Sequence, residues 1–344
     1  MNNEKNLVSL SSGELIVLTE ELKCIADLAN QYAKNAKSKS TLMAYASDWR
    51  DFEFWCKSKY LPFMPASPSV VAAYISDRAT NQWNDYKGVK RNPLKVASIE
   101  RRLTTISQAH KTANVPFERH HPAIQETWKG IRNTYGIAQV RKEPILIEDL
   151  RKMIDEIPIE KKGKPYPKGF RDRAVLLIGF SGAFRRSELA RILMDDIKFS
   201  REGIVVTLRK SKTDQIGEGR HIAIPYGSNH LTCPVRALQD WIDIAKIIDG
   251  ALFRSVNRHG RVSEKVMSDH SVAFIIKSNP VLRGREDLFS GHSLRAGFVT
   301  TAAMAGVPEH AIMRQTGHKK SDTLRKYIRP VNIWKENPAS KVGL

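Results

Sequence analysis

An interruption of helical periodicity near the middle of this 344-residue chain constrains its fold more than any other feature. Before it, apolar residues recur at three- and four-residue intervals, which predicts amphipathic helices. Between Gly136 and Pro144 the periodicity stops, as is typical of an interdomain linker. The length also exceeds what one hydrophobic core usually organises, so two domains are expected. The predicted parts are an N-terminal arm and helix start at 1–24, a helical domain at 25–136, a linker at 137–144 and a second domain at 145–344.

The first domain is predicted to be all helical. The expected helices cover 13–36, a stretch that follows Ser40, a stretch through Val70–Ile75, one that begins near Val96 or Ser98, and 123–135. In the second of these, large apolar side chains fall on one face, namely Leu42, Tyr45, Trp49, Phe52 and Trp55. A stripe of this kind is more often part of a core than a platform for stacking bases, so we expect an aromatic core here.

The second domain mixes helices with a short β-rich stretch. Helical patterning resumes at Glu148, a loop is expected at 161–167, and a helix at 171–180 ends at Ser181-Gly182. Two β-type segments, 204–208 and 221–225, flank a glycine-containing connection. The chain beyond Val235 is expected to be mostly helical.

Net charge narrows the choice of partners. The chain carries 56 Lys and Arg against 36 Asp and Glu, a net charge of +20. Residues 1–143 hold 21 basic and 14 acidic side chains and the remainder holds 35 and 22, so both halves are basic. A large polyanion is the simplest partner for such a field, although RNA, DNA and acidic membranes all stay open at this step.

Several classes of protein are disfavoured. No run of eighteen apolar residues is present and the N-terminus lacks the build of a signal peptide, so no membrane association is expected. The three cysteines, Cys24, Cys56 and Cys233, are odd in number and far apart, which favours reduced thiols in a cytoplasmic protein over a disulfide framework or a metal site.

The last third of the chain carries a chemically suggestive set of residues. The segment G-H-S-L-R-A-G contains His292 and Arg295, and G-H-K-K-S-D-T-L-R-K-Y contains His318 and Tyr327. Taken singly, each has an ordinary structural explanation, such as a solvated turn histidine or a core tyrosine. Taken together with upstream basic residues, they supply cationic donors for a phosphate and a phenol that can attack it.

The order of these residues resembles the tyrosine recombinase family, the group of lambda integrase, Xer and Cre. The upstream box A-F-R-R-S-E-L matches the family's Arg-x-x-Glu, which selects Arg185 rather than Arg186 and adds Glu188. The resemblance spans about residues 25 to 330. It implies a mainly α fold with a small β-sheet (an α+β catalytic domain), preceded by a helical core-binding (SAM-like) domain, the two forming a clamp around DNA.

The resemblance also implies a role for each matched residue. Tyr327 would be the nucleophile that forms a 3′-phosphotyrosyl bond, and Arg185 and Arg295 would clamp the scissile phosphate. Lys212 would protonate the leaving 5′-oxygen. His292 would assist proton transfer at the tyrosine, His318 would donate to a non-bridging oxygen and Glu188 would orient the other groups. Neither a metal nor ATP or another cofactor would be needed.

The implied activity is site-specific recombination through a Holliday junction by a homotetramer on double-stranded DNA with inverted-repeat target sites, in the cytoplasm at the nucleoid. Two alternatives remain: a type IB topoisomerase or telomere resolvase, and a DNA-binding regulator without catalysis. The short tail, with Val331, Ile333 and Trp334, is a candidate for docking into a neighbouring subunit. Basic side chains expected to contact DNA are Lys37, Lys39, Lys95, Arg101, Arg102 and Arg186.

Overall fold

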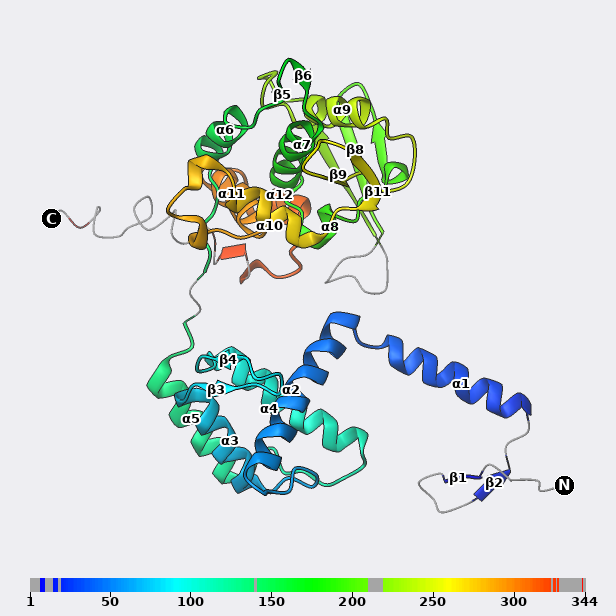
Figure 1. The fold of residues 1–344 in the computed structure, drawn as a ribbon, viewed down its shortest axis with the longest axis vertical. Coiled ribbons are helices and arrows are strands. Elements are labelled where there is room, and N and C mark those ends of the chain that lie inside the picture. Colours follow the sequence, from blue (N-terminus) through cyan, green and yellow to red (C-terminus); the bar gives the residue numbers. More distant parts are fainter. Residues whose placement is uncertain are drawn as a thin grey trace. The chain divides into compact units, whose positions relative to one another are not determined.

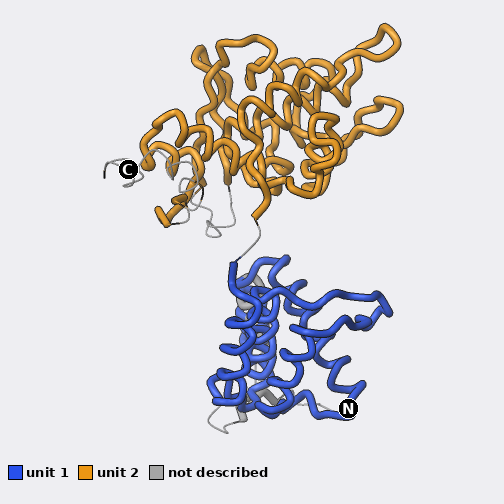
Figure 2. The backbone as a smooth tube through the Cα atoms, turned by 90° about the vertical axis from the view of Figure 1, so that its left-hand side faces the viewer, with its two compact units in different colours: residues 1–139 blue, residues 140–344 orange. Residues whose placement is uncertain are grey.

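The computed structural model describes residues 7–9, 15–17, 20–138, 141–209, 219–322, 324–325, 327 and 342. The chain divides into two compact units, residues 1–139 and 140–344 (Figure 2). The division falls inside the segment expected to link two domains. Each unit has its own hydrophobic core, since the two large clusters of buried apolar side chains share no member.

The first unit is built mainly from helices (Figure 1). Its helices are α1 (Glu20–Asn35), α2 (Lys39–Ser58), α3 (Pro68–Thr80), α4 (Val96–Thr112) and α5 (Pro122–Tyr135). Two short antiparallel hairpins, which the sequence did not predict, are β1 (Leu7–Ser9) with β2 (Leu15–Val17), and β3 (Trp83–Asn84) with β4 (Lys90–Arg91).

The expected helix at 13–36 was wrong at its start. Residues 15–17 form a strand that pairs with residues 7–9, and the helix begins at Glu20. Ile16 and Val17 have high strand propensity, so a β-hairpin competes with the helix there. The expected aromatic core is confirmed for Phe52 and Trp55, which are buried, and for Trp49, which packs against them. Leu42, at the start of the same stripe, is instead 42% exposed.

The helix starts of this unit follow local capping rules. The side chain of Ser38 accepts a hydrogen bond from the backbone N–H of Thr41 at the start of α2, and Ser67 does the same for Val70 at the start of α3. Each serine satisfies one backbone donor that the helix itself leaves unpaired. Pro68 occupies the first turn of α3, where its missing N–H costs nothing.

The second unit combines helices with a small three-stranded sheet. Its helices are α6 (Ile147–Asp155), α7 (Pro167–Ser181), α8 (Arg186–Leu189), α9 (Pro234–Ala245), α10 (Asp269–Lys277), α11 (Ser293–Met304) and α12 (Glu309–Thr316). Short 3₁₀ helices are η1 (Met194–Asp196), η2 (Pro280–Leu282) and η3 (Glu286–Leu288). The antiparallel sheet has the order β7 (Ile197–Phe199), β8 (Gly203–Leu208) and β9 (Arg220–Pro225). Helix α7 is buried along most of its length and packs on α9 and α11.

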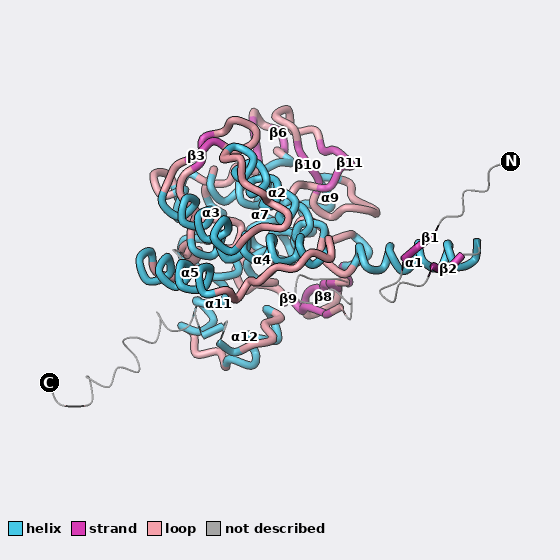
Figure 3. Tube along the Cα trace, turned by 90° about the horizontal axis from the view of Figure 1, so that it is seen from below, coloured by secondary structure: helices cyan, strands magenta, loops and turns pink. Residues whose placement is uncertain are grey.

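Two hairpins depart from the sequence prediction in this unit. The loop expected at 161–167 contains strands β5 (Glu160–Lys161) and β6 (Lys164–Pro165), and the region expected to be mostly helical contains β10 (Arg254–Val256) and β11 (Val262–Val266). Both are short (Figure 3), so they leave a mainly α fold with small sheets, as the resemblance implied. Among the described residues, no helix is both long and apolar enough to cross a membrane.

Candidate active site

Arg295 lies at the centre of the candidate site. It belongs to the first turn of α11, and its side chain is only 1% exposed. The guanidinium Nη1 donates to the carbonyl oxygen of Ala183 at 2.7 Å, and Nη2 lies 3.2 Å from Nε2 of His318. Burial, and next the positive charge of Arg185, lower the pKa of Arg295 to about 10. The guanidinium therefore stays charged at neutral pH although it is buried.

The hydrogen bonds of His318 determine its tautomer. A guanidinium has no acceptor, so Nε2 of His318 accepts the bond from Arg295. The proton of the neutral ring then sits on Nδ1, which donates to Oγ1 of Thr316 at 2.8 Å. Burial and the neighbouring cations, Arg295 foremost, lower the pKa of His318 to about 4. The ring is consequently neutral at pH 7.

Tyr327 contacts the other histidine of the set. Its hydroxyl lies 2.8 Å from Nε2 of His292, which occupies the N-cap position of α11 without a side-chain capping bond. The ring centroids of Tyr327 and His318 are 6.3 Å apart. The guanidinium carbon of Arg141 lies 5.8 Å from the centroid of the Tyr327 ring. A neutral imidazole at hydrogen-bond distance can take the phenol's proton.

A small apolar cluster holds Tyr327 in place. Leu324, one turn before it, is fully buried against Val299 of α11 and Ile312 of α12, and Tyr327 packs at the edge of this cluster. Ser321 adds a hydrogen bond to α12, because its hydroxyl donates to Oε2 of Glu309 at 2.7 Å. The tyrosine is thus positioned by packing on the helix that also carries Arg295.

Arg185 and Glu188 form the first-box part of the site. The backbone N–H of Arg185 donates to Oε2 of Glu188 at 2.9 Å, and its Nη1 donates to Oε1 at 2.5 Å. Glu188 is 7% exposed and therefore nearly buried. The carboxylate of Glu188 thus binds both the backbone and the guanidinium of Arg185 at the start of α8. The adjacent Arg186 pairs instead with Asp269, with Nε 3.1 Å from Oδ2. The two neighbouring arginines thus have different environments.

Sequence analysis missed Arg220, a third arginine of the site. It is the first residue of β9, and its Nη2 lies 3.9 Å from Oε2 of Glu188. A usable signal was present in the alternation of this strand, because Ile222 and Ile224 are buried and Arg220 shares their side of the sheet. A charged residue on the inward face of a strand requires a partner or a function.

Two predicted features lie outside the described residues. Lys212 falls within 210–218, and the tail residues Val331, Ile333 and Trp334 fall within 328–341. The other matched residues, which are Arg185, Glu188, His292, Arg295, His318 and Tyr327, are brought together around one site. The site therefore combines cationic donors with a phenol, which are the groups that phosphoryl transfer to a tyrosine needs.

The basic side chains of the first unit that were expected to contact DNA differ in exposure and in their partners. Lys37, Lys39 and Lys95 lie at or just before helix starts of the first unit, with Lys39 and Lys95 exposed. Arg101 is about half exposed and binds Asp48 with Nε at 2.7 Å and Nη2 at 3.0 Å.

Arg102 corrects the expectation that it faces DNA. It is 9% exposed, and its guanidinium donates to the carboxylate of Asp51 and to the hydroxyl of Tyr74. An arginine neutralised inside a core offers no cation to a phosphate backbone. The helical period explains the error, since neighbouring residues on α4 point about 100° apart and only Arg101 reaches the surface.

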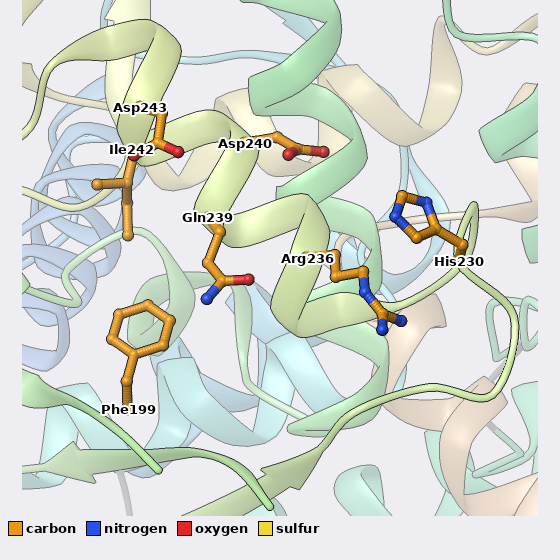
Figure 4. A pocket seen from close by; sticks show the side chains of 7 residues that line it. All are labelled: Phe199, His230, Arg236, Gln239, Asp240, Ile242 and Asp243. Atoms are coloured by element: carbon orange, nitrogen blue, oxygen red, sulfur yellow. The ribbon is translucent and has the colours of Figure 1, made fainter. Parts of the chain in front are cut away.

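An open pocket elsewhere in the second unit takes no part in this site. Figure 4 shows its lining, which comes mainly from α9, with Arg236, Gln239 and Asp243, and includes Phe199 of β7. None of the matched residues lines it. Among the described residues, no cluster of three or more His, Cys, Asp or Glu side chains could hold a metal ion.

Comparison with known proteins shows the family to which the chain belongs. Residues 145–332 match the model of the phage integrase family. An integrase/recombinase xerD homolog of Selenomonas ruminantium is 38% identical over 319 residues, which cover 91% of this chain and 88% of the relative. A tyrosine recombinase XerC of Pelobacter propionicus is 26% identical, with 84% of each chain covered.

Solved structures share the fold at low identity. A XerH site-specific recombinase in a post-cleavage complex with a palindromic difH substrate has a TM-score of 0.54 at 15% identity, covering 80% of this chain and 72% of that chain. The chain belongs to the phage integrase family. It is a site-specific DNA recombinase of the tyrosine type.

Proposed function

We propose that this recombinase cuts and rejoins duplex DNA through a covalent 3′-phosphotyrosyl intermediate on Tyr327. The 2.8 Å contact between Nε2 of His292 and the Tyr327 hydroxyl, next to the buried Arg295, is the observation that carries the proposal. A phenol with a reference pKa of roughly 10 attacks a phosphate well only when a base removes its proton or cations stabilise its anion. This site offers both.

The proposed cleavage step balances in atoms and charge. The Tyr327 oxygen attacks phosphorus, the bond from phosphorus to the 5′-oxygen breaks, and the phosphate stays on the 3′-oxygen. His292 accepts the phenol proton and Lys212 gives a proton to the leaving 5′-oxygen. Because one phosphodiester replaces another, rejoining is the same step in reverse and consumes no ATP. The arginines supply the charge stabilisation that a metal would otherwise give, so the mechanism requires no cofactor.

Arg185 and Arg295 are proposed to hold the non-bridging oxygens, with Glu188 fixing the direction of Arg185. Planar guanidinium groups suit this task because they donate in pairs. When a phosphate takes the Nη2 donor of Arg295, Nε2 of His318 loses the bond it now accepts. The phosphate's negative charge also raises the pKa of His318. His318 can then be protonated and donate to the phosphate.

We also propose an assembly on DNA, as the family resemblance implies. Four protomers would join two duplex sites with inverted repeats and exchange strands one pair at a time through a Holliday junction. Docking of the tail into a neighbouring subunit belongs to this proposal. Trp334→Ala is expected to weaken the joining of two sites while sparing single-site binding, and unchanged recombination would rule the docking out.

Trapping the covalent adduct tests the proposal directly. Wild-type protein and Tyr327→Phe are mixed with a pool of randomised nicked duplexes and resolved on a denaturing gel. The nick lets the cleaved end diffuse away, so the attacked phosphate stays on the protein. An adduct that forms with wild-type and not with the phenylalanine variant supports the proposal, and sequencing the trapped DNA identifies the site.

Other outcomes separate the alternatives. Binding without any adduct, on the pool and on DNA from the native locus, would favour a DNA-binding regulator without catalysis. An adduct accompanied by relaxation of supercoiled plasmid, without joining of two sites, would favour a topoisomerase-like reaction. Hairpin ends formed from a linear duplex would favour a telomere resolvase.

A further inference from the structure

Arg220 connects three parts of the site that lie far apart in the sequence. Its guanidinium Nη1 donates to the carbonyl oxygen of Gln315 at 2.9 Å, at the end of α12. Its Nη2 lies 3.9 Å from Oε2 of Glu188 on α8, the carboxylate that also binds Arg185. Arg220 itself begins strand β9. One side chain therefore joins the sheet to both helical parts of the site.

The Nη2 atom of Arg220 is buried and has no hydrogen-bond partner among the described residues. A buried donor left without a partner is costly, so such a group in a native structure calls for an explanation. Burial lowers the pKa of Arg220, the carboxylate of Glu188 opposes this shift, and the nearby charge of Arg185 adds to it. The protein thus keeps a partly uncompensated cation beside the phosphate-binding arginines.

The turn before His318 is shaped to fit this guanidinium. Gly317 has φ +69°, and a Cβ atom built on it would lie 2.7 Å from Nη1 and 2.8 Å from Cζ of Arg220. The side chain of Gln315 strengthens the same junction, because its Nε2 donates to the carbonyl oxygens of Ser181 at 2.9 Å and Ala223 at 3.2 Å. The residue that follows Gly317 is His318, which contacts Arg295.

We propose that Arg220 is a positioning residue of the strand-cleavage site, which holds the His318 turn against the sheet and holds Glu188 toward Arg185. The proposal rests on the phosphotyrosyl mechanism given above. Loss of Arg220 displaces His318 from Arg295 and lets Glu188 draw Arg185 away from the phosphate. The effect falls on the rate of cleavage within the bound complex rather than on DNA binding, because Nη2 is buried and does not reach the solvent.

Arg173 provides a matched control outside the site. Its Nη2 donates to the carbonyl oxygen of Leu231 at 2.8 Å, its Nε is buried without a hydrogen-bond partner among the described residues, and burial lowers its pKa. It therefore resembles Arg220 in environment but contacts none of the matched residues. A purely structural arginine is expected to behave like Arg173 when it is replaced.

The test compares Arg220→Gln, Arg220→Lys, Gly317→Ala and Arg173→Gln with wild-type protein on the nicked duplex pool. Affinity is measured by fluorescence anisotropy at fixed salt, and adduct formation by single-turnover kinetics at saturating DNA. We expect Arg220→Gln to slow adduct formation at least tenfold while changing the dissociation constant less than threefold. Gly317→Ala is expected to show the same defect, and Arg220→Lys a smaller one. Arg173→Gln is expected to keep the wild-type rate.

Two results would overturn the proposal. One is a wild-type rate for Arg220→Gln. The other is an equal loss of rate for Arg220→Gln and Arg173→Gln, which would reduce the effect to lost stability. The double variant Arg220→Gln/Gly317→Ala is expected to be no slower than the slower single variant, because both changes break one junction.

An NMR titration separates failure of this proposal from failure of the mechanism. The ring of His318 is faced by Arg295, Arg185, His292 and Arg220 and lies near Tyr327 and Thr316. Its resonance is assigned with His318→Gln and followed with pH in the protein alone. Arg220→Gln should raise the pKa of His318 and Arg173→Gln should not. If wild-type protein forms no adduct, this measurement still decides whether Arg220 controls the His318 environment.

Discussion

Each unit of this protein contains a cluster of arginines, and the two clusters are compensated differently. In the first unit, the carboxylate of Asp51 accepts hydrogen bonds from Tyr74 at 2.7 Å, from Arg78 at 3.0 Å and also from Arg102. Asp48 and Asp77 supply further carboxylates, so the buried charges are largely paired. The cluster has the properties of a structural ion network, whose value depends on its completeness.

At the candidate site of the second unit the balance is reversed, although Arg171 elsewhere in that unit is buried and paired with Asp172. Arg185, Arg220 and Arg295 share one nearly buried carboxylate, that of Glu188. The excess positive charge is unfavourable until an anion enters, and a phosphate supplies that anion. The comparison teaches that a buried arginine is not by itself a functional signal. The ratio of arginines to carboxylates within a cluster distinguishes a structural cluster from a phosphate site.

Breaking the compensated cluster should have the largest effect on stability. Asp51→Asn keeps the shape of the side chain but removes the carboxylate that Arg78 and Arg102 share. Arg78 then keeps only Asp77, and Arg102 only the more distant Asp48, so we expect a loss of about 3–5 kcal/mol in the free energy of unfolding of the first unit. Urea unfolding followed by circular dichroism measures it. Glu53→Gln is the control, since its pair with Lys57 is exposed and should contribute no more than about 0.5 kcal/mol. Equal losses would contradict the comparison.

Breaking the uncompensated cluster should affect chemistry and spare stability. Arg295→Met retains most of the side-chain volume and removes a buried charge, so we expect the rate of adduct formation to fall about 10²–10³-fold. The free energy of unfolding should stay the same or rise, because the cost of burying the charge disappears. Single-turnover cleavage and urea unfolding on the same preparation test both parts. A strong loss of stability would place Arg295 with the structural arginines.

Protonation of His318 adds positive charge to the uncompensated cluster, so the stability of the folded protein depends on pH. Its pKa is about 4 in the folded protein and ordinarily near 6.5, so between these values the unfolded chain binds a proton that the folded protein does not. The contribution of His318 to stability is therefore present above pH 6.5 and is lost as pH falls toward 4. Melting temperatures of wild-type and His318→Gln should diverge over this interval. Parallel curves would contradict the lowered pKa.

The smallest effect is expected at the arginine beside the site. Arg186 is exposed and pairs with Asp269, so Arg186→Gln should weaken DNA binding modestly and reduce the salt slope of log K by about 1 if it contacts one phosphate. The cleavage rate of the saturated complex should not change. The neighbouring Arg185→Gln provides the contrast, because it should slow cleavage strongly. A salt slope equal to that of wild-type would remove Arg186 from the DNA-contacting set.

Much of the architecture could be predicted because it depends on local patterns. Helices α2 to α5 follow apolar periodicity and capping residues such as Ser38 and Ser67, all within a few positions of one another. The wrong start of α1 arose where a Leu-Ile-Val run suits either structure and pairing with residues 7–9 decides between them. Short strands elsewhere were missed for the same reason, since their pairing partners are not visible in a local pattern.

The sequence by itself determined the kinds of chemistry available in this protein. The two histidines, the arginines and the tyrosine are present in the order of the tyrosine recombinases, and that order alone indicates the family. Residue identity and order are properties of the chain, so a sequence pattern can carry them without knowledge of how the chain packs.

Only the tertiary structure decided which charges are compensated. Residues 112 positions apart, Arg295 and Ala183, share a hydrogen bond, and Arg220 reaches Gln315 across 95 positions. Arg102 turned inward to Asp51 while its neighbour Arg101 stayed at the surface. The direction of a side chain and the carboxylate that it contacts depend on how distant segments pack. These contacts decide whether a cation is paired with a carboxylate or can still bind a phosphate.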